Sequence, residues 1–311
     1  MSRPRKLALP LLDGVAASAV HCPAGTWTQV LDFLAERLPR VDRADWLSRM
    51  ARGEVLDDQG AALSPDAPYR ANRRLYYYRL LAAELVVPFE EGIVFQDGQL
   101  LVADKPHFLP VTPKGRYVQQ TLLTRLIRRT GIATLSPIHR IDRETAGLVV
   151  FALQPETRAA YQALFRDRAV HKVYECIAPW RPDLRLPEVY RSRLEEREDA
   201  FMQMREVPGE PNAETRICVL EHDAELARYE LEPLSGRKHQ LRVQMNALGR
   251  PIVGDRIYPV LQPEEAEPDF NAPLQLLAKG IAFTDPITGA ARAFSSRLAL
   301  SLPCSASPST P

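Results

Sequence analysis

The sequence predicts an α+β fold, because strand and helix patterns follow one another without regular β-α-β alternation. Its 311 residues exceed the usual size of one domain, so we expect one large and one small domain. Hydrophobic residues make up 45% and charged residues 25% of the chain, which is typical of a soluble globular protein. Its 27 prolines, about 9% of 311 residues, exceed the average usage of about 5% and predict many loops and few long helices.

The first part of the chain predicts a small module of helices with a little strand. Apolar residues recur every three to four positions over residues 26–38 and again over 42–50, which predicts two amphipathic helices. Pro88 and the acidic pair that follows it are typical of a linker. We therefore expect a first domain over residues 1–88.

From residue 89 onward strand patterns dominate. Two apolar runs surround the pair Asp97–Gly98, which is a strong signal for a β-hairpin over residues 93–103. Further strands are expected over 147–153, 173–178, 214–221, 226–231, 281–284 and 290–294, and helices over 117–130, 155–168 and 236–247. We expect these elements to form one domain over residues 89–302, followed by a disordered tail over 303–311.

Charge and apolar patterning exclude several classes of protein. The formal net charge is +1, from 40 basic and 39 acidic residues, which excludes a histone-like polycation but not a local basic face that binds RNA. No apolar run approaches the ~18 residues of a membrane span, and Asp13 interrupts the short run that imitates a signal peptide. The four cysteines lack C-x-x-C spacing, so we expect reduced thiols in a cytoplasmic protein and no zinc site.

The densest polar cluster lies directly before a predicted buried strand. Residues 139–147 read His-Arg-Ile-Asp-Arg-Glu-Thr-Ala-Gly, with one imidazole, two guanidinium groups and two carboxylates. Positive charge nearby favours the ionised form of a carboxylate, and ionised Asp142 could attack or stabilise a sugar carbon with oxocarbenium character. The same pattern is also typical of a solvated charged turn that caps a strand.

Two further clusters carry possible chemistry. Residues 235–242 read Ser-Gly-Arg-Lys-His-Gln-Leu-Arg, and backbone N–H groups at a helix start beside basic side chains can bind phosphate. An exposed basic helix face would give the same pattern. Lys172 and Tyr174 lie at a strand start, where a tyrosine commonly belongs to the core. The available histidines and carboxylates match no metal-binding spacing, so we expect no metal.

Together these clusters resemble a specific family. The run His139–Gly147 resembles the His-Arg-Leu-Asp-Arg-x-Thr-Ser-Gly signature of the RluA-type pseudouridine synthases, and Lys172-Val173-Tyr174 is similar to that family's Lys-x-Tyr strand. Residues 236–242 and 248–255 resemble its Gly-Arg-Thr-His-Gln-Ile-Arg and Leu-Gly-x-Pro-Ile-x-Gly-Asp runs, and residues 101–106 its opening strand. The resemblance covers about residues 93–296. Its departures are Ile141, Ala146, Lys238 and Leu277.

The resemblance implies a mixed, mostly antiparallel central sheet with flanking helices. It also implies Asp142 as the essential carboxylate, Arg242 as its partner and Tyr174 as a stacking platform for uracil, with Arg140 taking the space that a flipped base leaves. No cofactor is implied. Contacts with the substrate RNA are expected from His139, Arg140, Arg143, Thr145, Lys172, Arg237, Lys238, His239 and Gln240.

The resulting hypothesis is an isomerase that converts a specific uridine of ribosomal or transfer RNA to pseudouridine. No membrane association and no obligatory protein partner are expected. The first module resembles, more loosely, the ribosomal-protein-type RNA-binding module that precedes many of these enzymes. Two alternatives remain: a catalytically lapsed RNA-binding protein of the same fold, and a glycoside or nucleoside hydrolase that uses Asp142 and Glu144 as paired carboxylates.

Overall fold

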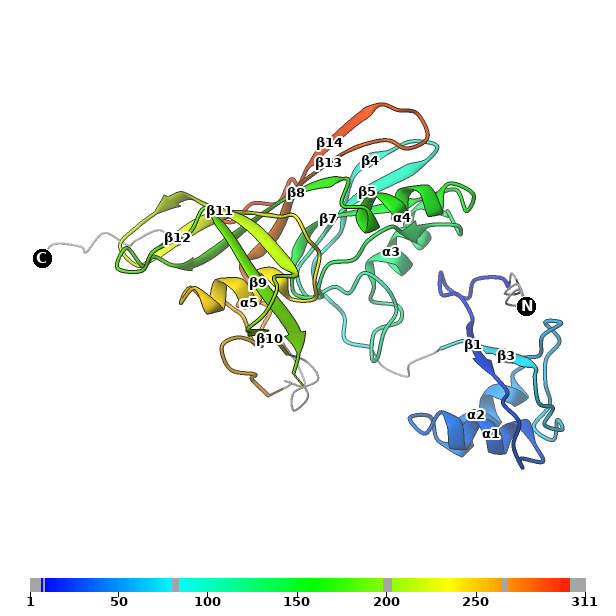
Figure 1. Ribbon diagram of the computed structural model, residues 1–311. Coiled ribbons are helices and arrows are strands. Elements are labelled where there is room, and N and C mark those ends of the chain that lie inside the picture. The colour runs from blue at the N-terminus through cyan, green and yellow to red at the C-terminus, as the bar shows by residue number, and fades with distance from the viewer. Residues whose placement is uncertain (1–6, 8, 80–83, 198–202, 264–267, 303–311) are drawn as a thin grey trace, which may run out of the picture. The chain divides into compact units, whose positions relative to one another are not determined.

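The computed structural model describes residues 7, 9–79, 84–197, 203–263 and 268–302 (Figure 1). These residues form two compact units, and the first contains the described residues up to Glu84 together with 114–119 and 127–133. The second contains the remaining described residues. The expected boundary after residue 88 stays a prediction, and the expected tail over 303–311 lies outside the described residues.

The first unit contains a small sheet and two helices (Figure 1). Its strands are antiparallel in the order β1-β3-β2, and all three are shorter than five residues. The two helices that the apolar periodicity predicts are confirmed, with Phe33, Leu34 and Trp46 fully buried between them and the sheet. The bounds are β1 (Ser18–His21), α1 (Val30–Arg37), α2 (Arg43–Ala51), β2 (Val55–Leu56) and β3 (Arg74–Tyr77).

An eleven-stranded sheet forms the second unit, with the main order β10-β9-β11-β12-β8-β13-β7-β5-β4. In addition β14 pairs with β13, and β6 pairs with β7. All pairs are antiparallel except β13 with β7, which confirms the mixed, mostly antiparallel sheet. The strands are β4 (Gly92–Gln96), β5 (Leu100–Lys105), β6 (Ser136–Pro137), β7 (Ala146–Ala152), β8 (Val170–Pro179), β9 (Val189–Glu196), β10 (Met204–Val207), β11 (Ala213–His222), β12 (Leu226–Pro233), β13 (Leu276–Thr284) and β14 (Ala291–Ser295).

Strands β5 and β7 are buried along their whole length. The continuous apolar run of β7 requires this, whereas β5 also buries Asp104 and Lys105 at its end. Helix α4 (Arg158–Arg166) packs on them through Tyr161, and α5 (Gln240–Ala247) packs on β8 and β12 through Leu241 and Met245. Each described helix is too short to cross a membrane.

The three helices expected after residue 89 are shorter than predicted, and at α3 and α5 a local feature replaces the first turn. Helix α3 (Leu122–Thr130) begins five residues after the expected start, since the N–H groups of Val118 and Gln119 donate to the carboxylate of Glu84 instead. Helix α5 begins at Gln240 rather than at residue 236, because His239 adopts a left-handed conformation with φ +55°.

Strands β9 and β10 are absent from the sequence-based expectation. The segment Val189–Glu196 reads Val-Tyr-Arg-Ser-Arg-Leu-Glu-Glu, and its charged side chains hide the strand pattern. The structure pairs these charges, for example Arg191 with Glu214 of the neighbouring β11 at 2.8 Å and Arg193 with Glu195 at 2.9 Å.

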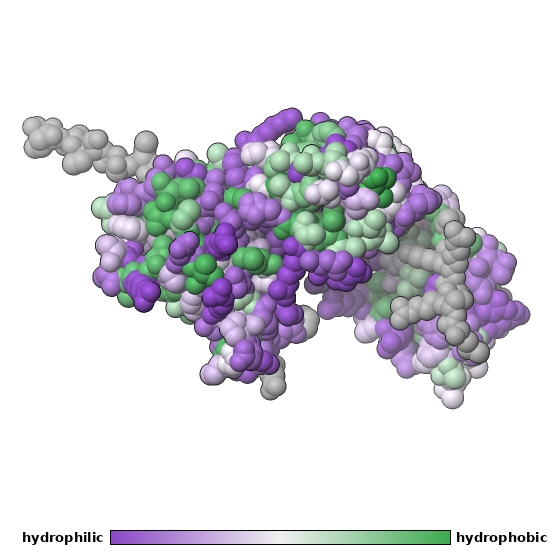
Figure 2. All heavy atoms as spheres, turned by 45° about the horizontal axis from the view of Figure 1, so that its top comes forward, coloured by the Kyte–Doolittle hydropathy of each residue, from purple (hydrophilic) through white to green (hydrophobic). Residues whose placement is uncertain are grey.

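Hydrophilic and apolar side chains alternate over the surface that Figure 2 shows. Large apolar residues reach the surface of the second unit at separate points of the sheet and its turns, including Leu184, Leu220 and Ile287. Single exposed apolar residues of this kind are normal for a globular protein.

Candidate active site

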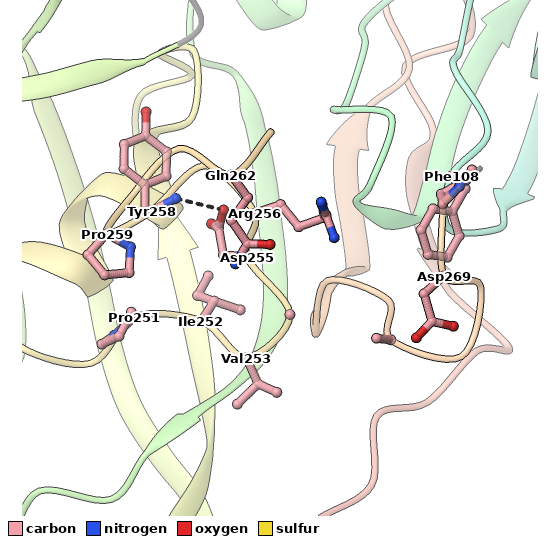
Figure 3. Close-up of a pocket in the computed structure, with 13 residues that line it drawn as sticks. Phe108, Pro251, Ile252, Val253, Asp255, Arg256, Tyr258, Pro259, Gln262 and Asp269 are labelled. Atoms are coloured by element: carbon pink, nitrogen blue, oxygen red, sulfur yellow. Dashed lines mark hydrogen bonds between the residues drawn. The ribbon is translucent and has the colours of Figure 1, made fainter. Parts of the chain in front are cut away.

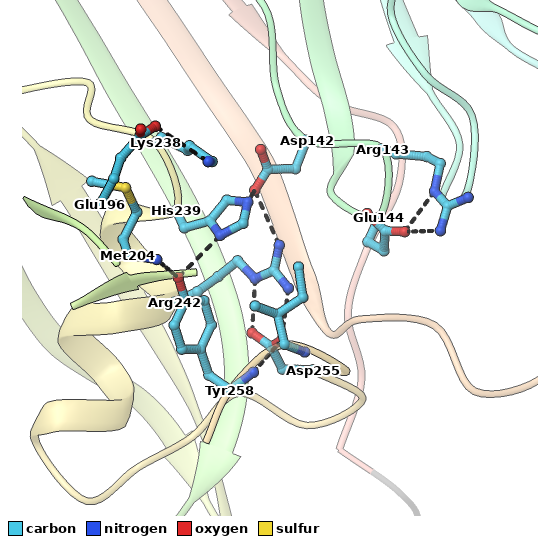
Figure 4. Close-up of polar contacts among 11 residues, drawn as sticks. Asp142, Arg143, Glu144, Glu196, Met204, Lys238, His239, Arg242, Asp255 and Tyr258 are labelled. Carbon is cyan, nitrogen blue, oxygen red and sulfur yellow. Dashed lines mark hydrogen bonds and ion pairs between the residues drawn. The ribbon is translucent and has the colours of Figure 1, made fainter. Parts of the chain in front are cut away.

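The structure brings Asp142 and Arg242 together, although 100 positions separate them (Figure 4). Asp142 lies in the loop before β7, and Arg242 is the third residue of α5. The guanidinium Nη1 donates to Oδ2 of Asp142 over 3.2 Å. The Arg242 side chain is 2% exposed and that of Asp142 is 32% exposed, so the carboxylate faces solvent while its partner is buried.

Arg242 is held from behind by Asp255, a residue to which the sequence analysis gave no role. Its Nε and Nη2 donate to the two Asp255 oxygens over 2.8 and 2.7 Å, and the Asp255 side chain is fully buried. Burial lowers the pKa of Arg242, but the hydrogen bonds and charge of Asp255 and the charge of Asp142 raise it above its usual value. Arg242 is therefore a fixed cation, and its Nη1 group is directed at Asp142.

His239 is the second group beside Asp142. Its Nε2 lies 3.8 Å from the same Oδ2 that Arg242 contacts, and its Nδ1 lies 3.0 Å from the hydroxyl of Tyr258. Burial lowers the pKa of His239, against the opposing charge of Asp142, so the ring is neutral near neutral pH. Both neighbours lie at Oδ2, and no described residue contacts Oδ1 of Asp142 within hydrogen-bond distance.

The loop that carries Asp142 is anchored to the end of β5. The Lys105 ammonium, fully buried, donates to the carbonyl of Arg143 over 2.8 Å, and the His107 Nδ1 lies 2.7 Å from the carbonyl of Glu144. Burial lowers the pKa of Lys105 to about 7, against the charges of Glu144 and Asp142. These two contacts fix the backbone on the C-terminal side of Asp142.

Tyr174 lies on β8, opposite Leu231 of β12 and Ala278 of β13. Burial and the nearby charge of Asp142 raise the pKa of its hydroxyl, so the phenol stays neutral. Within the described part of the chain its hydroxyl has no hydrogen-bond partner. The ring is half-buried, and its aromatic face is the group that it can offer to a base.

Two residues expected to contact RNA are committed to the fold instead. The His139 Nε2 accepts the Val150 N–H over 3.0 Å, and the ring stacks on Phe165 at 4.5 Å. Burial lowers the pKa of His139 to about 3, which leaves a neutral ring with no charge for a phosphate. Gln240 is 4% exposed, and its amide bonds Ser235, Arg237, Glu214 and Thr215. These polar atoms of His139 and Gln240 are therefore already bonded within the fold, and their contact with RNA stays a prediction.

The other residues that are predicted to contact RNA differ in how far their side chains are exposed. Arg140, Arg237 and Lys238 are exposed, and Lys238 forms a 3.4 Å ion pair with Glu196. Lys172 is half-buried and donates to the carbonyl of Ser235. Thr145 is 3% exposed, at the entry to β7.

Glu144 does not form a pair with Asp142. Its carboxylate accepts Nε and Nη2 of Arg143 over 2.6 and 2.5 Å, and Figure 4 shows this pair apart from the group of Asp142, His239 and Arg242. A mechanism with two facing carboxylates finds no support in this geometry.

A pocket of about 390 Å³ opens beside the Arg242–Asp255 pair (Figure 3). Its walls include Phe108, Ile252, Asp255, Arg256 and Tyr258. Asp142 is not part of its lining, and both oxygens of Asp255 are used by Arg242. The pocket therefore adds space beside the site, and its lining also includes Asp269, whose carboxylate accepts the Asn271 N–H over 2.9 Å. Among the described residues, no group of three or more histidine, cysteine or acidic side chains could hold a metal ion.

Sequence reasoning missed Lys105, Asp255 and Tyr258 as parts of the site. Lys105 and Asp255 stand in runs that match the family pattern, and this was the only signal that could have singled them out. Tyr258 lies three residues after Asp255 in a proline-containing loop, and no local pattern marks it.

Comparison with known proteins shows the family of this chain. A family model described as RNA pseudouridylate synthase matches residues 99–247. The chain is 31% identical over 215 residues to the dual-specificity RNA pseudouridine synthase RluA of Haemophilus influenzae, which covers 66% of this chain and 92% of that protein. The chain belongs to the RluA-like RNA pseudouridine synthases.

RluA-like synthases are isomerases, and this chain converts uridine in RNA to pseudouridine. It is also 32% identical over 170 residues to the mitochondrial tRNA pseudouridine(32) synthase of Saccharomyces cerevisiae, covering 53% of this chain and 36% of that protein. Among solved structures, human RNA pseudouridylate synthase domain containing 4 superposes with a TM-score of 0.51 at 28% identity. That match covers 67% of this chain and 88% of the human chain. The RluA-like fold thus extends over the unit that carries Asp142.

Proposed function

We propose that Asp142 is the catalytic carboxylate of this synthase and that Arg242 and Tyr174 complete its active site. The observation that carries this proposal is the ion pair between exposed Asp142 and buried Arg242, which Asp255 holds in a fixed position. A preorganised cation orients the carboxylate before the substrate arrives, so no reorganisation is needed in the reaction. Oδ1 of Asp142 is left to meet the sugar.

The reaction breaks the bond between N1 of uracil and C1′ of ribose and forms a bond between C5 and C1′. C5 then loses its proton, and N1 ends with one. Asp142 acts either as a nucleophile at C1′ or as a base on the neighbouring ribose hydrogen. Both routes regenerate the free, ionised Asp142 carboxylate when the product is complete. Tyr174 holds the uracil ring by stacking while the ring turns.

The uridine leaves its stack before it reaches Asp142, at a cost of a few kcal/mol that is lowest in loops. Arg140 is exposed and lies two residues before Asp142. We assign to its planar guanidinium the space that the flipped base leaves, because guanidinium planes stack on bases. Arg237 and Lys238, also exposed, supply charge for phosphates.

The substrate that we propose is a loop of ribosomal or transfer RNA. The yeast relative named as a tRNA pseudouridine(32) synthase supports the transfer RNA arm of this proposal. We place the reaction in the cytoplasm, where Cys22, Cys176 and Cys218, all free thiols, would stay reduced. We also propose that the first module, over residues 1–88, binds the same RNA.

Mapping pseudouridine in total RNA tests the proposal. RNA from cells with and without this gene is treated with a carbodiimide that stops primer extension at pseudouridine, and the gene is restored as wild type or as Asp142→Asn. We expect one stop that disappears without the gene and returns only with the wild type. If Asp142→Asn restores the stop, Asp142 is not the catalytic group. If the gene changes no stop in ribosomal or transfer RNA, the proposed substrate class is wrong.

A further inference from the structure

The hydroxyl of Tyr258 lies between a backbone N–H and the imidazole of His239 (Figure 4). The N–H of Met204 donates to this hydroxyl over 2.8 Å, and Nδ1 of His239 lies 3.0 Å away from it. Tyr258 is 5% exposed, and its own backbone N–H donates to Asp255 over 3.1 Å. The ring of Tyr258 also lies 5.6 Å from the Arg242 guanidinium, so it touches both groups that face Asp142.

The direction of these hydrogen bonds determines which nitrogen of His239 carries the proton. A backbone N–H can only donate, so the Tyr258 oxygen accepts from Met204. Its own proton then has one acceptor within reach, the Nδ1 of His239. An accepting Nδ1 in a neutral imidazole requires the proton on Nε2, which is the nitrogen 3.8 Å from Asp142.

The opposite arrangement is unfavourable at both ends. If Nδ1 carried the proton, the Tyr258 proton would lose its acceptor inside a buried site. The lone pair of Nε2 would then face the Asp142 carboxylate, which is itself rich in lone pairs. A buried donor without a partner costs free energy, and this cost selects one tautomer.

The backbone of His239 indicates that its position matters. Its φ is +55°, a left-handed conformation that is unfavourable for an L-residue other than glycine. Such strained residues gather at functional sites, where the surrounding structure holds them. Here the strain turns the ring of the residue before α5 toward Asp142.

We propose that Tyr258 is a positioning residue that fixes the Nε2–H tautomer of His239, so that an N–H group of His239, and not a lone pair, faces the Oδ2 of Asp142 to which Arg242 donates. Oδ1 is thereby kept for the ribose. The Tyr258 hydroxyl therefore acts on Asp142 only through His239, and Tyr258 itself does not touch the substrate. This inference rests on the proposed role of Asp142. It assigns His239 to the Asp142 carboxylate, whereas the sequence predicts that His239 contacts RNA.

The tautomer can be measured without RNA and without turnover. Two-bond ¹H–¹⁵N spectra of the full-length protein, labelled with ¹⁵N-histidine, separate the Nε2–H from the Nδ1–H tautomer, and loss of one signal set in His239→Asn assigns His239. We expect Nε2–H in the wild type and Nδ1–H, or exchange between both, in Tyr258→Phe. An Nδ1–H ring in the wild type would overturn the proposal, even if Tyr258→Phe failed to fold.

Turnover gives the second readout. Tyr258→Phe keeps the ring against Arg242 and removes only the hydroxyl, so we expect kcat to fall about tenfold, the effect of one hydrogen bond of usual net strength, with KM within twofold. The matched control is Tyr190→Phe on β9, which removes a hydroxyl bonded to Glu206 and should leave both constants unchanged. An unchanged kcat in Tyr258→Phe, or an equal loss in Tyr190→Phe, counts against the proposal. Inactive Asp142→Asn with an Nδ1–H wild type would keep the proposed function and reject only the role of Tyr258.

Discussion

Asp142 has partners on one oxygen and is open on the other. Arg242 and His239 both approach Oδ2, at 3.2 and 3.8 Å. This asymmetry fixes the orientation of the carboxylate through Oδ2 and leaves Oδ1 accessible to a substrate. Its neighbour Glu144 shows the contrast, because Arg143 already pairs with its carboxylate.

The two carboxylates should therefore differ sharply on substitution. We expect Asp142→Asn to reduce pseudouridine formation by about 10³-fold or more, because catalysis by a covalent or proton-abstracting carboxylate is lost. Glu144→Gln keeps the shape of the side chain and should retain near-full activity. The measurement is single-turnover conversion of a labelled RNA substrate. Equal losses in both variants would restore the paired-carboxylate hypothesis.

We expect substitution of Asp255 to lower the stability of the folded protein. Asp255→Asn leaves the buried Arg242 charge without its main partner, and we expect the free energy of unfolding to fall by about 3 kcal/mol. The matched control is Asp183→Asn, which breaks an exposed pair with Arg181 and should change stability far less, because solvent screens exposed ion pairs. Urea unfolding measures both. Equal stabilities of the two variants would show that Asp255 does not hold Arg242.

Lys105 gives stability a dependence on pH. The folded protein binds the Lys105 proton with a pKa of about 7, against 10.5 for an ordinary lysine. Below pH 7 the group is charged in both states. Between pH 7 and 10.5 only the unfolded chain keeps the proton, so the free energy of unfolding rises with pH, by up to about 1.4 kcal/mol per unit.

Comparison with Lys105→Met isolates this contribution, because other titrating groups are common to both proteins. We expect the difference in unfolding free energy, wild type minus variant, to increase from pH 7 to pH 9 in denaturant titrations. A difference that stays constant with pH would mean that Lys105 keeps an ordinary pKa.

At the scale of elements, the site depends on how closely β7 approaches β13. The two strands form the parallel pair of the sheet, with Gly147 opposite Ala278. A Cβ atom at Gly147 would lie 2.3 Å from the Ala278 carbonyl oxygen, and its φ is +107°. Glycine is therefore required there, and the close approach places the Asp142 loop next to β8 and Tyr174.

Gly147→Ala should separate these strands. We expect a loss of about 3 kcal/mol in stability, from overpacking and from a backbone conformation that alanine rarely adopts. The control is Gly98→Ala in the β4–β5 turn, where a new Cβ meets nothing within 4 Å. Thermal unfolding compares the two. If both variants unfold at the same temperature, the approach of β7 to β13 is not limited by Gly147.

For the whole molecule, the net charge of +1 gives no long-range attraction to RNA. Many arginines are neutralised locally, as in the pairs Arg43–Asp32, Arg73–Asp58 and Arg228–Glu175. Binding to RNA must then come from local groups of exposed cations, and the group that we propose is Arg140, Arg237 and Lys238.

RNA binding should weaken steeply with salt, because each neutralised phosphate releases a counterion. Between 50 and 200 mM salt we expect the affinity of Asp142→Asn protein for substrate RNA to fall about 10²-fold or more. Arg237→Gln should reduce the slope of log K against log[salt] by about one. Arg181→Gln, whose side chain is paired with Asp183, should leave the slope unchanged. A flat salt response would contradict an interface built on these cations.

The sequence by itself determined the fold class, the reaction and the three residues that we propose as its centre. It could do so because Asp142, Tyr174 and Arg242 stand in ordered runs that match one family, and because apolar periodicity marks β5, β7, α1 and α2. Where charge interrupts the pattern, as in β9, the strand was missed. Helix starts were missed where side chains and a left-handed residue replaced the first turn.

Only the tertiary structure decided which polar side chains are free. His139 and Gln240 look like RNA ligands in the sequence, yet their hydrogen bonds are consumed by Val150 and by the turn before α5. Asp255 and Tyr258 look unremarkable, yet they hold Arg242 and His239 on Asp142. Hydrogen-bond partners far apart in the chain are set by packing of the whole sheet, and local sequence patterns carry no information about them.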